Sequence, residues 1–388
     1  MKKKLKNIAF LATVPYAADF FLGPHILNLK SKYTIFLLTN LKNNNDYLYF
    51  KKKYPNINII NIPFKRKIHL FYDFISFIKL LLFFFNNKVD IVHSITPKAG
   101  LLSHFVSFIN NVPIRIHTFT GQIWSRHNKI KKIFFIFIDN LIVLFSSNIL
   151  VDGISQSKYL KKNSFFISKS ISVINNGSIC GVDTSRFFPD ANVKFLFRKK
   201  YGIKKNDVVL LFLGRINKDK GVYDLVTAFN NCLLIKENIK LFLCGPIEDK
   251  LFNNYINNLD LNIKKSIFLL DFTNNPEHIF NASDIFCMPS YREGFGQAVI
   301  EASACCLPVI VSNIYGLADS FKKNKTGLVY EVGSIKCLEQ KLLYLINNKS
   351  KRLSLGKQGR IFVQTKFEQK NIVKSFESYY INLWDKNI

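Results

Sequence analysis

The sequence predicts an α/β protein with two doubly wound domains, each with a parallel sheet covered by helices on both faces. Short runs rich in β-branched residues alternate with longer stretches of helical character, a pattern typical of parallel sheets. The alternation breaks once, in a turn-rich and then basic segment near residue 176, and restarts after it. The chain has 388 residues and a hydrophobic content of 48%, enough for two full cores.

The first predicted domain covers residues 1–175. Its strands are expected in short apolar runs bounded by polar residues or proline. These runs are Asn7–Val14, Thr34–Thr39, Ile57–Ile62, Val89–His93, Ile114–Thr118 and Ile149–Gly153. The chain starts with basic and then apolar residues, as a signal peptide does. However, the apolar part is too short and alternates like a strand, so we do not expect secretion.

Two long apolar runs in this half need to be weighed as membrane spans. Phe71–Phe85 contains Asp73 and Lys79, and Ile133–Leu150 contains Asp139 near its middle. Both runs are near or below the roughly 20 residues that a spanning helix needs, and a central carboxylate costs roughly 2.5–3.5 kcal/mol on insertion scales. We therefore expect buried helices here, and helices that touch a membrane are the second interpretation.

The expected strand at Ile114–Thr118 ends in a group of polar residues. His117 is followed by two hydroxyl side chains, by the amide of Gln122 and by Trp124. Ligands of parallel sheets bind at the carboxyl ends of strands. Polar groups beside an aromatic ring suit a sugar, which has hydroxyl edges and apolar C–H faces. A histidine at a strand end is as consistent with a structural role, so both interpretations stay open.

Residues 176–206 are predicted to link the domains, because they begin with a turn-rich break and contain a basic segment. The second domain is predicted at 207–367, and a terminal helix at 368–388. Its strands are expected at Asp207–Leu213, Ile239–Cys244, Ile267–Phe272, Asp284–Met288, Pro308–Val311 and Gly327–Tyr330. Its helices are expected at Val222–Cys232, Gln297–Cys305, Ile335–Asn347 and Glu368–Trp384.

The loop that follows the first strand of this domain is bounded by Gly214 and Gly221 and is rich in charge. Arg215 offers a planar fork of donors and Lys220 a compact cation, so together they suit a diphosphate. The loop lacks the Gly-Lys-Ser/Thr ending of ATPase phosphate loops and does not fit the Gly-x-Gly-x-x-Gly dinucleotide pattern. Taken alone, it is as consistent with an ordinary charged surface loop.

A second loop, Ser290–Ala302, follows a later strand and leads into a helix. Gly294, Phe295 and Gly296 stand where the helix begins, so several backbone N–H groups are expected to face outward together. Such a place binds anions, and phosphate above all. Taken alone, this segment is also consistent with a surface turn.

Two carboxylates, Glu293 and Glu301, flank this second loop. A carboxylate is a poor phosphate ligand but a good bidentate acceptor for a vicinal diol. The two loops together therefore predict a sugar-nucleotide site, with Glu301 on the ribose and Glu293 on the transferred sugar. Thr273 ends another strand, on the side where the nucleotide base is expected.

The formal net charge of +29 is extreme. It favours a polyanionic partner or an anionic membrane, and codon bias in an A- and T-rich genome is an equal alternative. The lysines cluster at Lys2–Lys4, Lys51–Lys53, Lys65–Lys67, Lys129–Lys132 and Lys158–Lys162. All seven cysteines lie in the second half without metal-ligand spacing, so we expect reduced, buried thiols.

The paired motifs, Gly-Arg-x(4)-Lys-Gly from Gly214 and Glu-Gly-Phe-Gly-x(4)-Glu from Glu293, resemble those of the retaining glycosyltransferases of family 4. The resemblance implies the GT-B fold, in which two Rossmann-like domains face a cleft and the last helix crosses back to the first domain. It implies that Arg215 and Lys220 hold the donor diphosphate and that Glu301 takes the ribose hydroxyls.

The resemblance also implies that the backbone of residues 294–296 binds phosphate or sugar, and that Glu293 contacts the donor sugar beside the reacting carbon. His117 matches a histidine that contacts the donor sugar from the other domain in this family. One departure lies in the first loop, 15–24, where only Gly23 stands in place of a common Gly-Gly pair. The acceptor pocket of the family is therefore not carried over.

Within the family, the segments His117–Trp124 and Gly177–Asp183 resemble bacterial enzymes that extend sugars on polyprenyl diphosphate carriers for O-antigen, lipopolysaccharide or capsule. This implies a UDP-sugar donor and an undecaprenyl-diphosphate-linked acceptor, with Gln122 and Trp124 on the acceptor side. It also implies contact with anionic lipid at the inner face of the cytoplasmic membrane and no nucleic-acid partner. No cofactor or metal is expected, because the sequence has no Asp-x-Asp pair.

Two alternatives remain from the sequence. One is an enzyme of the same fold that acts on a soluble acceptor. The other is a non-catalytic basic protein that binds membrane or nucleic acid, which accounts for the charge but not for glycines and acids at both loops.

Overall fold

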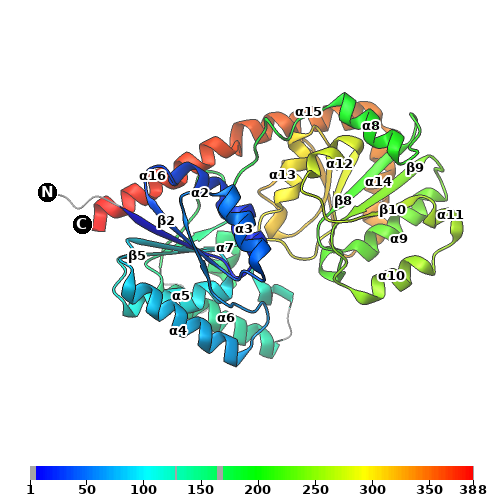
Figure 1. Cartoon of the computed structure of the whole chain (residues 1–388). Helices are drawn as coiled ribbons and strands as arrows, with labels where there is room; N and C mark the ends of the chain where they lie inside the picture. Colours follow the sequence, from blue (N-terminus) through cyan, green and yellow to red (C-terminus); the bar gives the residue numbers. More distant parts are fainter. Residues whose placement is uncertain (1–5, 127–128, 164–168, 388) are drawn as a thin grey trace. The chain divides into compact units, whose positions relative to one another are not determined.

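The computed structural model describes residues 6–126, 129–163 and 169–387. It divides the chain into two compact units, which are unit 1 (Met1–Gly181 with Gln369–Ile388) and unit 2 (Val182–Glu368). Each unit has one parallel sheet with helices packed on it, as Figure 1 shows. The predicted class of two doubly wound α/β domains is therefore confirmed. The lysine cluster Lys2–Lys4 lies outside the described residues.

The sheet of unit 1 has the strand order β3-β2-β1-β4-β5-β6-β7, and all its pairs are parallel. Most residues of the central strands are buried, because helices cover both faces of the sheet, whereas the ends of the edge strand β3, Asn58 and Asn61, are exposed. They are β1 (Asn7–Leu11), β2 (Thr34–Thr39), β3 (Asn58–Asn61), β4 (Ile91–Ser94), β5 (Ile114–Phe119), β6 (Asn148–Val151) and β7 (Ile171–Ser172).

The helices of unit 1 form a layer on each face of this sheet (Figure 1). One layer contains α2 and the last helix, α16, whose buried Phe376, Tyr380 and Trp384 share a core with β1 and β2. The other contains α4, α5 and α6, which pack side by side. The bounds are α1 (Pro15–Ala17), the π-helix η1 (Ala18–Leu22), α2 (Gly23–Leu29), α3 (Asn44–Lys53), α4 (Leu70–Asn86), α5 (Pro97–Ile109), η2 (Ile123–Arg126), α6 (Lys129–Phe145), α7 (Ile154–Asn163) and α16 (Gln369–Asn387).

The sheet of unit 2 has the order β10-β9-β8-β11-β12-β13, again with parallel pairs throughout. Its strands are β8 (Val208–Leu213), β9 (Ile239–Cys244), β10 (Ile267–Leu270), β11 (Ile285–Met288), β12 (Val309–Ser312) and β13 (Gly327–Tyr330). Its helices are α8 (Ala191–Lys200), η3 (Lys218–Lys220), α9 (Val222–Leu233), α10 (Lys250–Asn257), α11 (Leu261–Lys264), α12 (Pro276–Ala282), α13 (Gln297–Ala304), η4 (Tyr315–Leu317), α14 (Ile335–Asn347) and α15 (Lys349–Lys366).

The stretch predicted as a linker, 176–206, is not a simple connection. The chain passes from one unit to the other between Gly181 and Val182, and α8 lies within this stretch. Helix α8 packs on α12, and its Arg198 forms an ion pair with Asp284. A basic segment can thus be an ordinary surface helix, whose charges are balanced by acids that are distant in the sequence.

Two further expectations need correction. The apolar run Ile133–Leu150 is not one helix, because α6 ends at Phe145 and β6 starts at Asn148. The expectation that the runs at α4 and α6 are buried is wrong for one face of each helix. Phe71 of α4 exposes 65% of its surface and Ile133 of α6 exposes 61%. No helix in the part of the chain that the structure describes is long and apolar enough to cross a bilayer.

Candidate functional site

The candidate site lies where the strand order of unit 2 reverses. From β8 the chain adds β9 and β10 on one side, and it then returns to place β11 on the other side of β8. In doubly wound sheets, the loops at the carboxyl ends of the two strands at this point diverge and leave room for a ligand. The predicted motif loops, after β8 and after β11, are these two loops.

The two motif loops touch through their backbones. Gly221 has a φ of 66°, and a Cβ atom on it would stand 2.1 Å from the carbonyl oxygen of Pro289. A larger residue does not fit there, which explains the glycine that ends the first motif. The backbone N–H of Tyr291 donates to the carbonyl of Asp219 at 2.9 Å. The sequence predicted each loop separately, and the fold joins them.

Lys220 and Glu293 form an ion pair at the centre of the candidate site. The Lys220 Nζ lies 2.5 Å from Glu293 Oε1, and the hydroxyl of Ser290 donates to the same oxygen at 2.7 Å. Only 16% and 13% of the two side chains are exposed. Because the pair is largely shielded from water, the attraction between its two charges is strong. This attraction holds the two side chains in one geometry.

The Glu293 loop is also supported from behind by the segment after β12. A Cβ atom on Gly316 would stand 2.0 Å from the carbonyl oxygen of Glu293, so the backbone of η4 lies directly against this loop. The hydroxyl of Ser312 donates to the carbonyl of Ser290. Contacts on both sides fix the position of the Glu293 carboxylate before any ligand binds.

Arg215, the second predicted diphosphate ligand, has a different carboxylate partner from Lys220. Its guanidinium lies 2.7 Å from Glu248, which also accepts from the amide of Asn217 at 3.0 Å. Glu248 comes from the loop after β9, which pairs with the first motif loop through the bridge between Ile216 and Ile247. Glu248 was not predicted from the sequence, where its only signal is its position just after Cys244-Gly245-Pro246 at the end of a strand.

Gly294, Phe295 and Gly296 lead directly into α13, as expected. Gly296 is the N-cap and has a φ of 82°, which favours glycine. Phe295 is buried against Phe367, with ring centroids 5.3 Å apart. Within the described residues, nothing accepts a hydrogen bond from the backbone N–H groups of 294–296. These donors at the start of a helix can bind an anion.

Glu301 lies one turn into α13 and is buried, with 6% of its surface exposed. Burial raises the pKa of its carboxyl to about 8, while the nearby amide of Gln297 and the charge of Arg186 act in the opposite direction. The Gln297 amide donates to it at 3.4 Å. Glu301 is therefore mostly protonated at neutral pH when the site is empty.

Thr273 lies in the loop after β10, at the same carboxyl edge of the sheet. Its hydroxyl accepts from the backbone N–H of Asn275 at 3.0 Å. The neighbouring Asn274 carbonyl accepts from Arg186, and the charge of Arg186 acts on Glu301. These contacts connect the Thr273 loop to the surroundings of Glu301.

The predicted residues of unit 1 are buried. His117 of β5 is fully buried, its Nδ1 lies 2.7 Å from the Ser94 hydroxyl, and burial lowers the pKa of its ring to about 3. Trp124 donates from Nε1 to Asp139 at 2.7 Å. Gln122 accepts from Gln156 at 3.3 Å. The roles assigned to these three residues remain predictions, and each residue also has a structural role.

The sheet of unit 1 also has a point where the strand order reverses, between β1 and β4. There the Thr13 and Thr96 hydroxyls lie 2.7 Å apart, and the backbone N–H of Thr13 donates to Thr96 at 2.8 Å. This pair was not predicted from the sequence. The signal was a threonine at the end of each of two apolar runs, which is common in any α/β protein.

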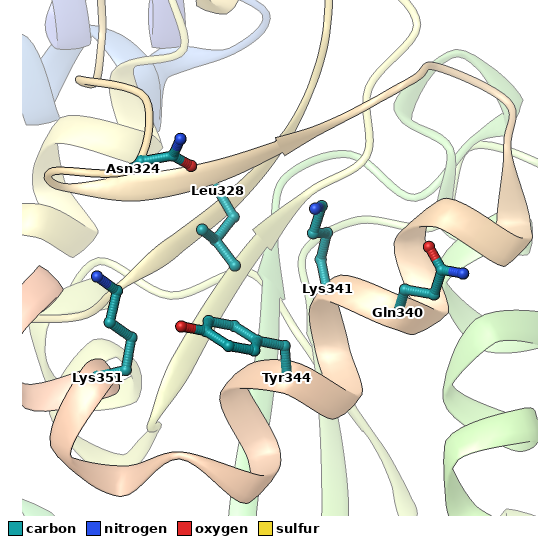
Figure 2. Close-up of a pocket in the computed structure, with 6 residues that line it drawn as sticks. All are labelled: Asn324, Leu328, Gln340, Lys341, Tyr344 and Lys351. Carbon is teal, nitrogen blue, oxygen red and sulfur yellow. The ribbon is translucent and has the colours of Figure 1, made fainter.

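A surface pocket of about 370 Å³ lies elsewhere in unit 2 and contains none of the predicted residues. Figure 2 shows that Lys341 and Tyr344 of α14, Lys351 of α15 and Leu328 of β13 point toward it. No group of three or more His, Cys, Asp and Glu side chains in the described ranges is arranged to hold a metal ion.

Residues 193–362, which include both motif loops, match the protein family described as glycosyl transferases group 1. The chain is 34% identical over 333 residues to the capsular polysaccharide biosynthesis glycosyltransferase CapM of Staphylococcus aureus, covering 85% of this chain and 86% of CapM. It is 29% identical over 289 residues to an Escherichia coli UDP-Gal:α-D-GlcNAc-diphosphoundecaprenol α-1,3-galactosyltransferase, covering 73% of each protein.

The structure is similar to that of Anabaena HepE in complex with UDP-glucose. The TM-score is 0.80, and the match covers 97% of this chain and 99% of HepE at 17% sequence identity. At this identity the likeness concerns the fold alone, and it confirms the predicted GT-B class of two Rossmann-like domains.

Proposed function

The chain belongs to the glycosyl transferases group 1 family, and from this we propose that it transfers a sugar from a UDP-sugar to an undecaprenyl-diphosphate-linked saccharide, with retention at the anomeric carbon. The sugar is a hexose or an N-acetylhexosamine, and the product serves capsule or O-antigen synthesis. The observation that carries the proposal is the Lys220–Glu293 pair beside the N–H groups of residues 294–296, at the point where the sheet of unit 2 reverses.

The donor diphosphate is assigned to the cationic side of this site. Lys220, Arg215 and the N–H groups of residues 294–296 neutralise the charge that develops on the leaving UDP. Arg215 reaches the diphosphate by exchanging its exposed carboxylate partner, Glu248, for a phosphate oxygen. Glu293 contacts the donor sugar beside the reacting carbon, and Glu301 and Thr273 take the nucleoside.

The transfer step needs no covalent enzyme intermediate. The bond between the anomeric carbon and the diphosphate oxygen breaks, and the acceptor hydroxyl forms a new bond to the same face of that carbon. The hydroxyl proton passes to the leaving phosphate oxygen. The negative carboxylate of Glu293 stabilises the positive charge on the sugar during this exchange.

We assign the acceptor to unit 1. The chemical class of the acceptor is taken from the likeness of this chain to the two polysaccharide enzymes named above. The name of the Escherichia coli relative states that it acts on GlcNAc-diphosphoundecaprenol. Such a lipid keeps the enzyme at the inner face of the cytoplasmic membrane. We assign Gln122 and Trp124 to the acceptor side and His117 to the donor sugar, which requires the buried surroundings of these residues to open when substrates bind.

The first test is UDP release from a panel of UDP-sugars, measured in EDTA with and without extracted bacterial lipid-linked saccharides. We expect release from one donor, only with the lipid acceptor, and at the same rate without EDTA, because protein cations take the place of a metal. Release with an acceptor that has no lipid would reject the assigned acceptor. A rate restored only by Mg²⁺ or Mn²⁺ would reject the metal-independent mechanism.

A second prediction concerns how the affinity for the accepted UDP-sugar changes with pH. With a pKa of about 8 in the empty site, Glu301 must lose a proton to accept two ribose hydroxyls. The complex then binds fewer protons than the free protein, so affinity rises with pH up to the free pKa. Between about pH 6.5 and pH 8.5 we expect the affinity, measured by calorimetry, to rise roughly 25-fold.

The Glu301→Gln variant is the control for this titration. It has no proton to lose, so its affinity is expected to be lower and constant over the same range. A wild-type affinity that stays constant, or falls as the pH rises, would show that the ribose is not bound by an ionised Glu301.

A further inference from the structure

Helix α4 exposes a continuous apolar stripe to solvent. The exposed residues recur at intervals of three or four, which places them on one face of the helix. They are Leu70, Phe71, Phe74, Ile78, Leu82 and Phe85, and the fractions exposed at the two ends are 83% and 80%. Large apolar side chains in such a row are unusual on a monomer surface and mark a contact site.

Helix α6 has a second stripe of the same kind. Ile130, Ile133, Phe134 and Phe137 are spaced as one helical face, and Leu144 continues it two turns later. Helix α5 packs between α4 and α6 and adds Phe108 and Ile109. The three helices form one layer on the sheet of unit 1 (Figure 1). We call these exposed residues of α4, α5 and α6 the apolar face.

Basic residues lie at one end of this layer. Exposed Lys65, Arg66 and Lys67 precede α4, and exposed Lys129 and Lys131 begin α6. The crossover helices of a parallel sheet all run in the same direction, so the starts of α4 and α6 lie at the same end of the layer. The basic residues at the starts of α4 and α6 therefore lie together at one end of the layer, and their positive potentials add.

Acidic residues do not offset this charge. The three helices are described throughout, and their only carboxylates are Asp73 and Asp139. Asp73 forms an ion pair with Lys98 at 2.7 Å, and Asp139 is buried and accepts from Trp124. The apolar face is thus bordered by positive charge alone.

We propose that the apolar face binds an anionic lipid bilayer by lying in its interface, with the lysines on the headgroups. An apolar face next to lysines and arginines is the composition of helices that lie flat in this region. A second copy of the chain is a less favourable partner for the apolar face. Each copy has a net charge of +29, so association through this face would bring like charges together and be opposed by their repulsion. The inference rests on these exposed residues and not on the transfer reaction.

The test is flotation of the full chain with vesicles of phosphatidylglycerol or of neutral phosphatidylcholine. We expect binding to the anionic vesicles that weakens with salt, and much weaker binding to the neutral ones. The triple variant Phe71→Ser, Phe74→Ser, Phe137→Ser is expected to bind anionic vesicles at least roughly tenfold less, because three inserted rings are lost. Its thermal melting curve shows whether it is folded.

A matched triple variant controls for the loss of exposed apolar residues in general. Leu234, Leu261 and Leu353 of unit 2 expose 82%, 69% and 64% of their surfaces. Their replacement by serine is expected to leave vesicle binding unchanged. Equal losses in both triple variants, or no loss in the first, would overturn the assignment of the surface.

A charge variant tests the basic part of the proposal. Lys65→Gln, Lys67→Gln, Lys129→Gln, Lys131→Gln is expected to lose most binding to anionic vesicles. The unit 2 variant Lys336→Gln, Lys357→Gln is expected to keep it, because these exposed lysines lie in the other unit. Unchanged binding in the first variant, or equal binding of the wild type to neutral vesicles, would reject an electrostatic contact.

Insertion is measured directly with a tryptophan in place of Phe74. Both native tryptophans are buried, so they add a constant background. The emission of the Phe74→Trp variant is expected to shift to the blue and to be quenched by brominated lipid, unlike that of Leu353→Trp. If the apolar-face variant instead loses a dimer seen by light scattering and keeps its vesicle binding, the face is an interface between copies and the proposal is wrong.

Discussion

Replacement of Lys220 by alanine is expected to lower kcat by roughly a hundredfold or more, equal to about 2.7 kcal/mol of transition-state stabilisation. The ammonium group is the most shielded cation of the motif loops, and it is held 2.5 Å from Glu293. A charge fixed in this way stabilises the leaving diphosphate without first being reorganised by solvent. The measurement is UDP release at saturating donor and acceptor, with KM determined for each.

Two matched variants make this result specific. Lys218 belongs to the same loop but is exposed, so Lys218→Ala is expected to keep nearly the wild-type rate. Lys220→Arg keeps the charge in a larger group and is expected to recover part of the activity. A near-normal kcat in Lys220→Ala, in protein with a wild-type melting curve, would remove Lys220 from the mechanism.

Replacement of Glu293 by alanine is also expected to lower kcat by roughly a hundredfold or more, for a different reason. This carboxylate is fixed by the Ser290 hydroxyl and by Lys220, and η4 supports the backbone behind it. Glu293 is proposed to stabilise the positive charge that develops on the sugar during the transfer. Its loss is therefore expected to affect kcat more than the KM of the donor. Glu237→Ala, an exposed site in the same unit, is the control.

The pairing of the two residues makes their effects dependent on each other. Each single variant leaves the other charge without its partner in a shielded place, whereas the double variant Lys220→Ala, Glu293→Ala does not. We expect the loss of kcat in the double variant to be much smaller than the product of the two single losses. A strictly multiplicative loss would mean that the two residues act separately.

Elements with a strong local pattern were predictable from the sequence residue by residue. The ranges Thr34–Thr39, Ile239–Cys244, Gly327–Tyr330 and Ile335–Asn347 agree with β2, β9, β13 and α14. Helix α15 was not predicted, because few of its residues are buried and two of those are glycines. Gly356 lets the helix lie against the backbone of Cys306, where a Cβ atom would stand 1.9 Å from the carbonyl oxygen. Such close packing leaves little apolar periodicity in the sequence.

The candidate site was predictable as two separate loops but not as a set of contacts. The contact of Lys220 with Glu293 follows from the pairing of β8 with β11, which are far apart in the sequence. The Arg215–Glu248 pair depends on how the loop after β9 folds back, with the N–H of Glu248 donating to the Ile216 carbonyl. No local pattern contains this information.

The burial of His117 could also not be predicted from the neighbouring sequence. The residue follows a strand-like run and precedes polar residues, so a place at an open strand end was reasonable. In the structure β5 lies between β4 and β6, and α5 covers it so closely that a Cβ atom on Gly100 would stand 2.6 Å from the His117 ring. Access to a strand end depends on the helix that covers it, which is a tertiary property.

The division of the chain between the units has a consequence for biosynthesis. Unit 2 is one continuous segment, whereas unit 1 is completed only by α16, which follows unit 2 in the sequence. Until α16 leaves the ribosome, the core that receives Phe376, Tyr380 and Trp384 is open to water. Unit 2 can therefore fold before unit 1 is complete. Until α16 is synthesised, the rest of unit 1 exposes an apolar surface of the kind that chaperones bind.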